Sequence, residues 1–119
     1  MKLKNKPLSV PLESEEQRAV VDYLEFRGLK FSSIPNSTFT RSWKQKTKNK
    51  QEGLRAGLPD LLVVTKDHLL FIEMKRLKGG KVSSVQKEWL EALNKINDGV
   101  VAKICKGAEE AIEFINKYI

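Results

Sequence analysis

Two short apolar runs joined by four polar residues constrain the fold of this 119-residue chain more than any other feature. The runs occupy residues 61–64 and 69–75 and are rich in Leu, Val, Ile and Phe. Runs of this length and composition are typical of buried strands, and the polar segment 65–68 leaves room only for a tight turn. The sequence therefore predicts a β-hairpin at the centre of the fold.

Three ionisable residues interrupt this apolar hairpin. Glu73 and Lys75 are two positions apart, and because side chains alternate between the faces of a strand, both project from the same face. Asp60 stands at the start of the first strand, directly after Pro59, and the hairpin can bring it close to both. Two carboxylates beside one ammonium are costly to bury unless a cation compensates them, so the pattern favours a metal site. The alternative is a solvated strand end with Glu73 and Lys75 side by side.

The pattern Asp-x12-Glu-x-Lys after a proline resembles the core of the PD-(D/E)xK nucleases. Three segments together resemble, more narrowly, the virus-type replication-repair nuclease (VRR-NUC) family: GLPD at 57–60, FIEMKR at 71–76 and SVQKEWL at 84–90. The PD…ExK motif by itself occurs in many unrelated sequences. The three segments in this order, including a glutamine on a later helix, are much more specific for the family. The resemblance covers residues 13–106.

This resemblance implies a metal-dependent active site. It assigns the catalytic residues as Asp60, Glu73, Lys75 and Gln86. It assigns the metal ligands as Asp60, Glu73, the backbone carbonyl of Met74 and an acidic residue on the first helix. Oxygen ligands of this kind suit Mg²⁺ or Mn²⁺ and make zinc a poor fit.

The acidic ligand on the first helix has three candidates. Residues 14–17 open this helix in the manner of a capping box. We choose Glu16 because it lies in the first turn on the side of Val20, with Glu13 and Glu15 as competitors. Acidic residues in a first turn are also favoured by the helix dipole without any function.

Gln86, near the start of the second long helix, has two interpretations. In a Ser-x-x-Gln capping box its side chain returns to the backbone of Ser83. In the family that the chain resembles, the equivalent glutamine faces the active site, where its amide can orient water or phosphate.

A basic segment precedes the hairpin. The net charge of +7 and the isoelectric point near 9.6 favour a polyanionic partner. Between Asn36 and Gly57, six basic residues stand against one acid, Glu52. Phe39 and Trp43 lie among them, and interleaved basic and aromatic groups suit phosphate neutralisation and base stacking. The alternative is a solvated, partly helical face, with Trp43 anchoring the segment to the core.

The resemblance places Asn36 and Ser37 near bound nucleic acid, although an Asn-Ser turn that satisfies its own backbone is the alternative. The nucleic-acid-binding residues that we predict are Asn36, Ser37, Arg41, Trp43, Lys44, Lys46, Lys48, Arg55 and Arg76.

The order of predicted elements indicates an α/β fold. Helix, three strands, helix, strand and helix build a restriction-endonuclease-like three-layer α/β/α arrangement around a central mixed β-sheet. We expect residues 1–12 to form a flexible basic N-terminal arm and residues 13–119 to form one nuclease domain. Cys105 is expected as a small buried hydrophobe. The absence of an apolar leader or membrane span in the sequence favours a cytoplasmic protein, in a bacterial or phage-infected cell.

Together these features predict a Mg²⁺- or Mn²⁺-dependent DNA endonuclease that hydrolyses phosphodiester bonds. The resemblance adds structure-selective cleavage of branched or Holliday-junction-like DNA in a phage or DNA-repair setting. We expect a homodimer, because one chain supplies one metal site and a junction needs two symmetric cuts. The alternative is a non-catalytic DNA- or RNA-binding module that retains the nuclease fold.

Overall fold

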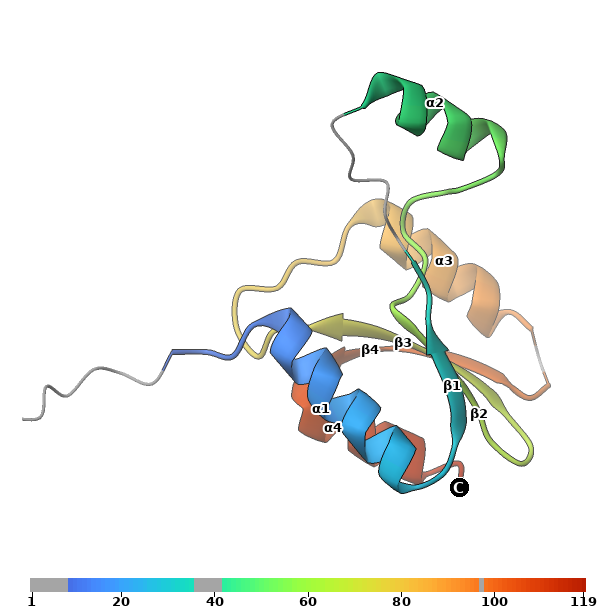
Figure 1. Cartoon of the computed structure of the whole chain (residues 1–119). Helices are drawn as coiled ribbons and strands as arrows, with labels where there is room; N and C mark the ends of the chain where they lie inside the picture. The colour runs from blue at the N-terminus through green and yellow to red at the C-terminus, as the bar shows by residue number, and fades with distance from the viewer. Residues whose placement is uncertain (1–8, 36–41, 97) are drawn as a thin grey trace, which may run out of the picture.

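The computed structural model describes residues 9–35, 42–96 and 98–119 and contains alternating helices and strands (Figure 1). In chain order the elements are α1 (Glu13–Phe26), β1 (Lys30–Ser33), α2 (Trp43–Gln51), β2 (Leu61–Val64), β3 (Leu69–Lys75), α3 (Ser84–Asn94), β4 (Val100–Lys106) and α4 (Gly107–Asn116). Within the described ranges, no helix has both the length and the apolar character needed to cross a membrane.

The sheet is mixed and has the strand order β1-β2-β3-β4. β1 pairs with β2 and β2 with β3 in antiparallel fashion, whereas β4 runs parallel to β3. The predicted hairpin is confirmed: Leu61 pairs with Ile72 and Val64 with Leu69. The turn closes through the backbone N–H of Thr65, which donates to the carbonyl of His68 at 2.9 Å.

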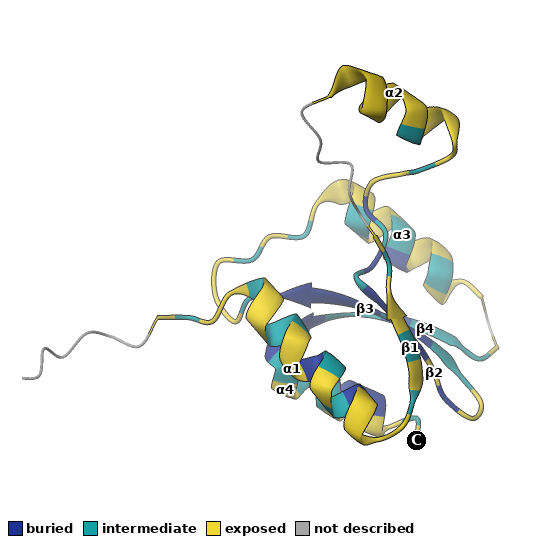
Figure 2. Ribbon diagram, viewed as in Figure 1, coloured by how far each residue is buried: buried dark blue, intermediate teal, exposed yellow. Residues whose placement is uncertain are grey.

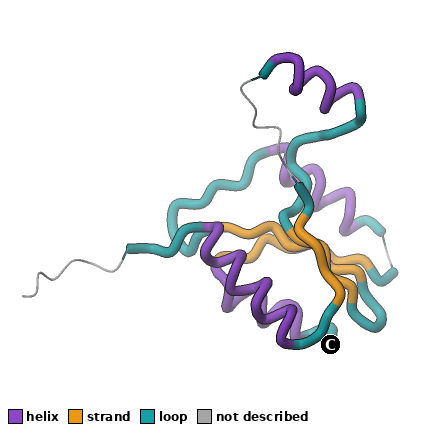
Figure 3. The backbone as a smooth tube through the Cα atoms, in the orientation of Figure 1, coloured by secondary structure: helices purple, strands orange, loops and turns teal. Residues whose placement is uncertain are grey.

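Helices cover both faces of this sheet (Figures 1 and 3). α1 and α4 pack against each other on one face, and both contact β3. α3 lies on the opposite face, where it packs against β4 and supplies the crossover that parallel strands require. The predicted α/β fold, with helices flanking a mixed four-stranded sheet, is therefore confirmed.

The main core lies between the sheet and the pair α1 and α4, where buried residues appear dark blue in Figure 2. It is built from alternate positions of the strands and from one face of each helix, because each element turns only part of its surface inward. Cys105 belongs to it, as expected, and is fully buried. The core residues are Val20, Leu24, Leu61, Val63, Leu70, Ile72, Met74, Cys105, Ala111, Phe114 and Ile115.

Helix α2 is the element that sequence patterning did not identify. Its nine residues include four lysines and no apolar stripe, so no periodic signal marks it. Ser42 begins the helix by accepting a hydrogen bond from the Gln45 backbone N–H at 3.2 Å. None of its residues is buried, and it stands apart from the sheet as an almost entirely exposed arm (Figure 2).

Candidate active site

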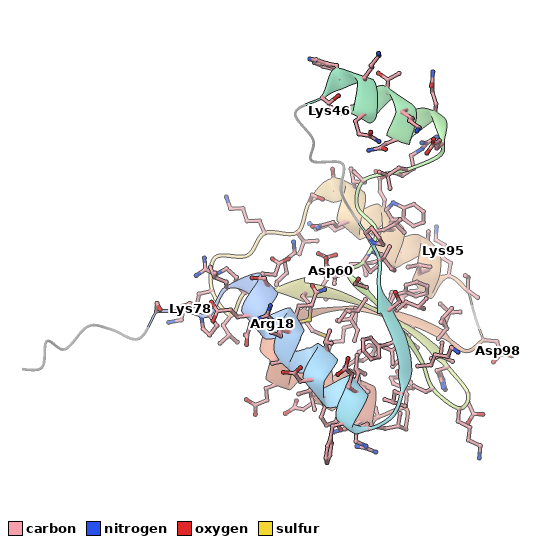
Figure 4. All side chains as sticks on the ribbon, in the orientation of Figure 1. Arg18, Lys46, Asp60, Lys78, Lys95 and Asp98 are labelled. Atoms are coloured by element: carbon pink, nitrogen blue, oxygen red, sulfur yellow. The ribbon has the colours of Figure 1, made fainter. Side chains whose placement is uncertain are left out.

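The hairpin brings Asp60 close to Glu73. Asp60 directly precedes β2, whose first residue, Leu61, pairs with Ile72, the neighbour of Glu73 on β3. Three backbone contacts hold Asp60: its N–H donates to Ile72 O at 2.9 Å, its carbonyl accepts from Ile34 N at 2.8 Å, and its Oδ2 accepts from Met74 N at 2.7 Å. Figure 4 shows Asp60 at the centre of the molecule, between α1 and α3.

Glu73 and Lys75 project together from β3 and are almost completely buried. Their side chains are 2% and 9% exposed, and Lys75 Nζ lies 3.5 Å from Glu73 Oε2. Gln86 of α3 completes the group. Its Nε2 donates to Glu73 Oε2 at 3.0 Å, and its Oε1 accepts from Lys75 Nζ at 3.1 Å. A carboxylate, an ammonium and an amide therefore form a closed triangle.

Gln86 also makes the predicted capping box. The Ser83 N–H donates to Gln86 Oε1 at 2.9 Å, and the Gln86 N–H donates to Ser83 Oγ at 3.2 Å. The cap and the contact with Glu73 and Lys75 therefore coexist in one geometry, while the role of the amide towards water or phosphate stays a prediction. Because its oxygen is held by the backbone of Ser83 and by Lys75, its NH₂ group is directed at Glu73.

The first helix delivers a third carboxylate from Glu13. One carboxylate oxygen each of Glu13, Asp60 and Glu73 lies within 4.8 Å of the others. Glu15 instead accepts the Leu12 N–H at 3.3 Å.

Glu16, our choice from the sequence, lies outside this group. Its Oε2 is buried against Gly107 at the start of α4 and has no hydrogen-bond partner among the described residues. Glu13 and Glu16 are one turn apart, so the position of α1 along the sheet decides which of them reaches Asp60. The predicted start of this helix at residues 14–17 is wrong: the helix begins at Glu13, with Leu12 as its N-cap, and this places Glu13 in the first turn.

Burial raises the pKa of each of the three carboxyl groups, and the charge of Asp60 raises the pKa of Glu73 and Glu13 further. Burial raises the pKa of Glu73 to about 8, and the negative charge of Asp60 adds to this effect, while Lys75 opposes it. Burial also raises the pKa of Asp60, against the stabilising N–H of Met74, and raises the pKa of Glu13, where Asp60 again contributes. One ammonium, Lys75, therefore does not neutralise the cluster.

The cluster fits a hard divalent cation. Glu73 Oε1 is buried and has no hydrogen-bond partner among the described residues, which is costly for a carboxylate oxygen. The three converging side chains offer oxygen only, with no His or Cys in the group. Such a set suits Mg²⁺ or Mn²⁺. The carbonyl of Met74, named from the family resemblance, stays a prediction.

Several of the residues expected to bind nucleic acid lie on α2, whereas Arg55 and Arg76 bind backbone carbonyls. Trp43, Lys44, Lys46 and Lys48 lie on α2 and are exposed, with Lys46 Nζ 5.2 Å from the centre of the Trp43 ring. Figure 4 shows Lys46 on this arm, away from the sheet. Asn36, Ser37 and Arg41 lie outside the described residues.

The two remaining arginines bind backbone carbonyls. Arg55 Nη1 donates to the carbonyls of Lys50 and Leu54, each at 3.1 Å, and so closes the C-terminal end of α2. Arg76 donates to the carbonyls of Val10 and Pro11 at 3.1 and 3.4 Å. The nucleic-acid contacts predicted for both arginines stay predictions.

Comparison with known proteins agrees with this architecture. The family description "VRR-NUC domain" matches residues 11–109. A solved structure titled "VRR_NUC domain protein" is 28% identical, with a TM-score of 0.76 over 94% of this chain and 91% of that chain. A second, titled "VRR_NUC domain", is 22% identical and shares the fold, with a TM-score of 0.61 over 90% of this chain and 97% of that one. A search of the curated proteins gives no match. The chain belongs to the VRR-NUC family, a family of nucleases.

Proposed function

We propose that this chain is a Mg²⁺- or Mn²⁺-dependent deoxyribonuclease that hydrolyses phosphodiester bonds within DNA. The observation that carries the proposal is the meeting of the Glu13, Asp60 and Glu73 carboxylates beside the buried ammonium of Lys75. Burying several acidic groups together is costly unless an opposite charge compensates them. Binding a cation explains why the cluster is present.

Glu13, Asp60 and Glu73 would hold the ion, together with the carbonyl of Met74. When bound, the ion activates water for attack and offsets negative charge on the phosphate. The protein keeps the ligands in place beforehand: Met74 N–H holds the Asp60 carboxylate, and the Gln86 amide holds that of Glu73. Preorganisation of this kind lowers the reorganisation needed during the reaction.

Lys75 and Gln86 are assigned to the phosphate and the attacking water and not to the metal ion. An ammonium with three donors can bind Gln86 and Glu73 and still direct a proton towards a phosphate oxygen or the attacking water. Its charge offsets the negative charge that develops on the phosphate. Gln86 keeps Lys75 and Glu73 at a constant separation while this happens.

DNA binding is assigned to α2 and the adjoining basic segment. The arm exposes Trp43 and four lysines and buries none of its residues on its own chain, which suits contact with a phosphate backbone. The family resemblance and the single site per chain support branched or Holliday-junction-like DNA as substrate, a phage or DNA-repair setting, and a homodimer that makes paired cuts.

Cleavage of a substrate panel tests the proposal. Single-stranded, duplex, flap and four-way-junction DNA, with a matched RNA duplex, would be incubated with Mg²⁺, Mn²⁺ or EDTA. Metal-dependent cuts within DNA, strongest on the junction, are the expected result. Binding without cleavage under every metal condition would instead assign the chain as a non-catalytic module.

A further inference from the structure

Arg76 directly follows β3, and its guanidinium binds two successive backbone carbonyls ahead of α1. Nη2 donates to Val10 O at 3.1 Å and Nε donates to Pro11 O at 3.4 Å. Helix α1 begins two residues after Pro11, at Glu13. A single guanidinium therefore connects the end of the strand that carries Glu73 to the segment that leads into Glu13.

These bonds add to the few local contacts at the start of α1. The residue before the helix is Leu12, whose side chain makes no capping hydrogen bond, although its N–H donates to Glu15 Oε1 at 3.3 Å. The two carbonyls bound by Arg76 precede the helix, so the guanidinium ties the segment that leads into Glu13 to the end of β3.

A second contact holds the first turn of α1 from the other side of Glu13. A β-carbon at Gly107 would lie 2.7 Å from Glu16 Oε2 and 2.6 Å from Leu77 Cδ2, so these three residues are in close contact. Leu77 follows Arg76 in the sequence. Gly107 thus lies against both the first turn of α1 and the residue that follows Arg76.

Without such contacts, repulsion would move Glu13 away from the site. The carboxylates of Glu13, Asp60 and Glu73 lie within 4.8 Å of one another and repel when ionised. Glu73 is held by pairing with β4 and Asp60 by backbone hydrogen bonds to Ile72 and Ile34, whereas Glu13 sits at a helix terminus. Glu13 is therefore the member of the group whose position depends on an external anchor.

We propose that Arg76 is a positioning residue that holds Glu13 in the carboxylate cluster, and that divalent-cation affinity depends on it. The inference rests on the proposed function, in which Glu13 is a metal ligand. It gives Arg76 a role other than the nucleic-acid contact expected from the sequence. The planar guanidinium suits this role because it can bind two carbonyls at once.

Calorimetric titration of Mn²⁺ into the full chain, without DNA, tests the proposal. Arg76→Ala is expected to weaken Mn²⁺ binding about 10-fold or more, the effect typical of residues that orient metal ligands. Arg76→Lys keeps the positive charge but loses the planar guanidinium that binds two carbonyls at once. Mn²⁺ binding by this variant should therefore stay weaker than that of the wild type. Full recovery with lysine would mean that charge alone matters and would overturn the proposal. Arg18→Ala removes an exposed arginine of α1 and should bind as wild type does.

A double substitution separates positioning from a general loss of structure. If Arg76 acts through Glu13, adding Arg76→Ala to Glu13→Gln should cause no further loss of Mn²⁺ affinity. An undiminished 10-fold loss in that background would overturn the proposal. Circular dichroism in EDTA establishes that each variant is folded, and Arg76→Lys carries the test if the alanine variant is not.

The same titrations distinguish this inference from the proposed function. If the wild-type chain binds no Mn²⁺, the proposed function fails. If the wild-type chain binds Mn²⁺ and Asp60→Asn abolishes binding, the metal site stands. In that case, an unchanged Mn²⁺ affinity in Arg76→Ala, together with weaker DNA binding in EDTA, would overturn only the role of Arg76.

Discussion

The side-chain NH₂ of Gln86 donates to Glu73 Oε2 at 3.0 Å, from the first turn of α3 to the end of β3. The same amide accepts from the Ser83 N–H at 2.9 Å, so the cap of the helix orients the group that meets the carboxylate. Local helix chemistry and the candidate active site are thus joined in one side chain, and that coupling can be tested.

Gln86→Glu is expected to preserve the cap and disrupt the site. The new carboxylate would still accept from Ser83 and Lys75, but its second oxygen would face Glu73 and repel it. We expect a fall in kcat of about 10-fold or more, since a group holding a catalytic carboxylate is replaced by one that repels it. Single-turnover cleavage with Mg²⁺ measures the effect.

Ser83→Ala is the matched control for this substitution. It removes the hydroxyl that accepts the Gln86 N–H but keeps the Ser83 N–H that orients the amide. Stability should fall by about 1 kcal/mol, the usual cost of losing a helix cap, while kcat changes little. Equal losses of kcat in both variants would argue against a separate role for the Gln86 amide.

Asp60→Asn or Glu73→Gln should abolish metal-dependent cleavage and leave the fold and DNA binding largely intact. Each substitution keeps the size of the side chain and removes one ligand charge. A loss of roughly 100-fold or more in kcat is expected for either. Electrophoretic binding assays in EDTA provide the control, and cleavage within a few-fold of wild type would remove that residue from the metal site.

Stability of the metal-free protein should fall as pH rises from about 5 to about 8. Glu73 has a folded-state pKa of about 8, against 4.5 as its ordinary value, so the folded chain keeps a proton that the unfolded chain releases. Between these values unfolding releases a proton, and the free energy of unfolding falls with pH by at most about 1.4 kcal/mol per unit. Thermal melts in EDTA measure this slope.

Two comparisons check that Glu73 is the source. Glu73→Gln should flatten the slope, because the amide does not titrate. Adding Mn²⁺ to the wild type should raise the melting temperature more at pH 8 than at pH 6, since the ion competes with the proton. A slope that persists in Glu73→Gln would assign the titration to Asp60, Glu13 or both.

Neutralising Lys44, Lys46 and Lys48 together should weaken binding to DNA of any sequence. If each lysine contacts one phosphate of a duplex, the slope of log Kd against log salt should fall by about two to three. Neutralising Lys30, Lys66 and Lys117, which are exposed on other elements, is the control for net charge. An unchanged slope in the α2 variant would show that these three lysines are exposed to solvent and do not contact phosphate.

The homodimer is tested by light scattering at micromolar concentration, with and without junction DNA. A protein mass of twice the 13.6 kDa chain mass, after the mass of any bound DNA is subtracted, is expected in at least the DNA-bound state. A 13.6 kDa monomer under both conditions would contradict paired cuts by this protein alone.

The sequence alone predicted the hairpin and the meeting of Asp60 with Glu73 and Lys75. Strand periodicity and a short turn set that register, and both act between residues close in the chain. It also predicted the cap at Ser83, which is local as well.

That Glu13, and not Glu16, joins the carboxylates depends on contacts between elements distant in the chain. Both lie on one side of α1, and the choice depends on how far the helix is shifted along the sheet. That shift is set by contacts with elements distant in the chain, since α1 packs against α4 and β3 and the segment before it binds Arg76. Periodicity identifies the face of a helix, but its position along its axis comes from contacts distant in sequence, which no local pattern encodes.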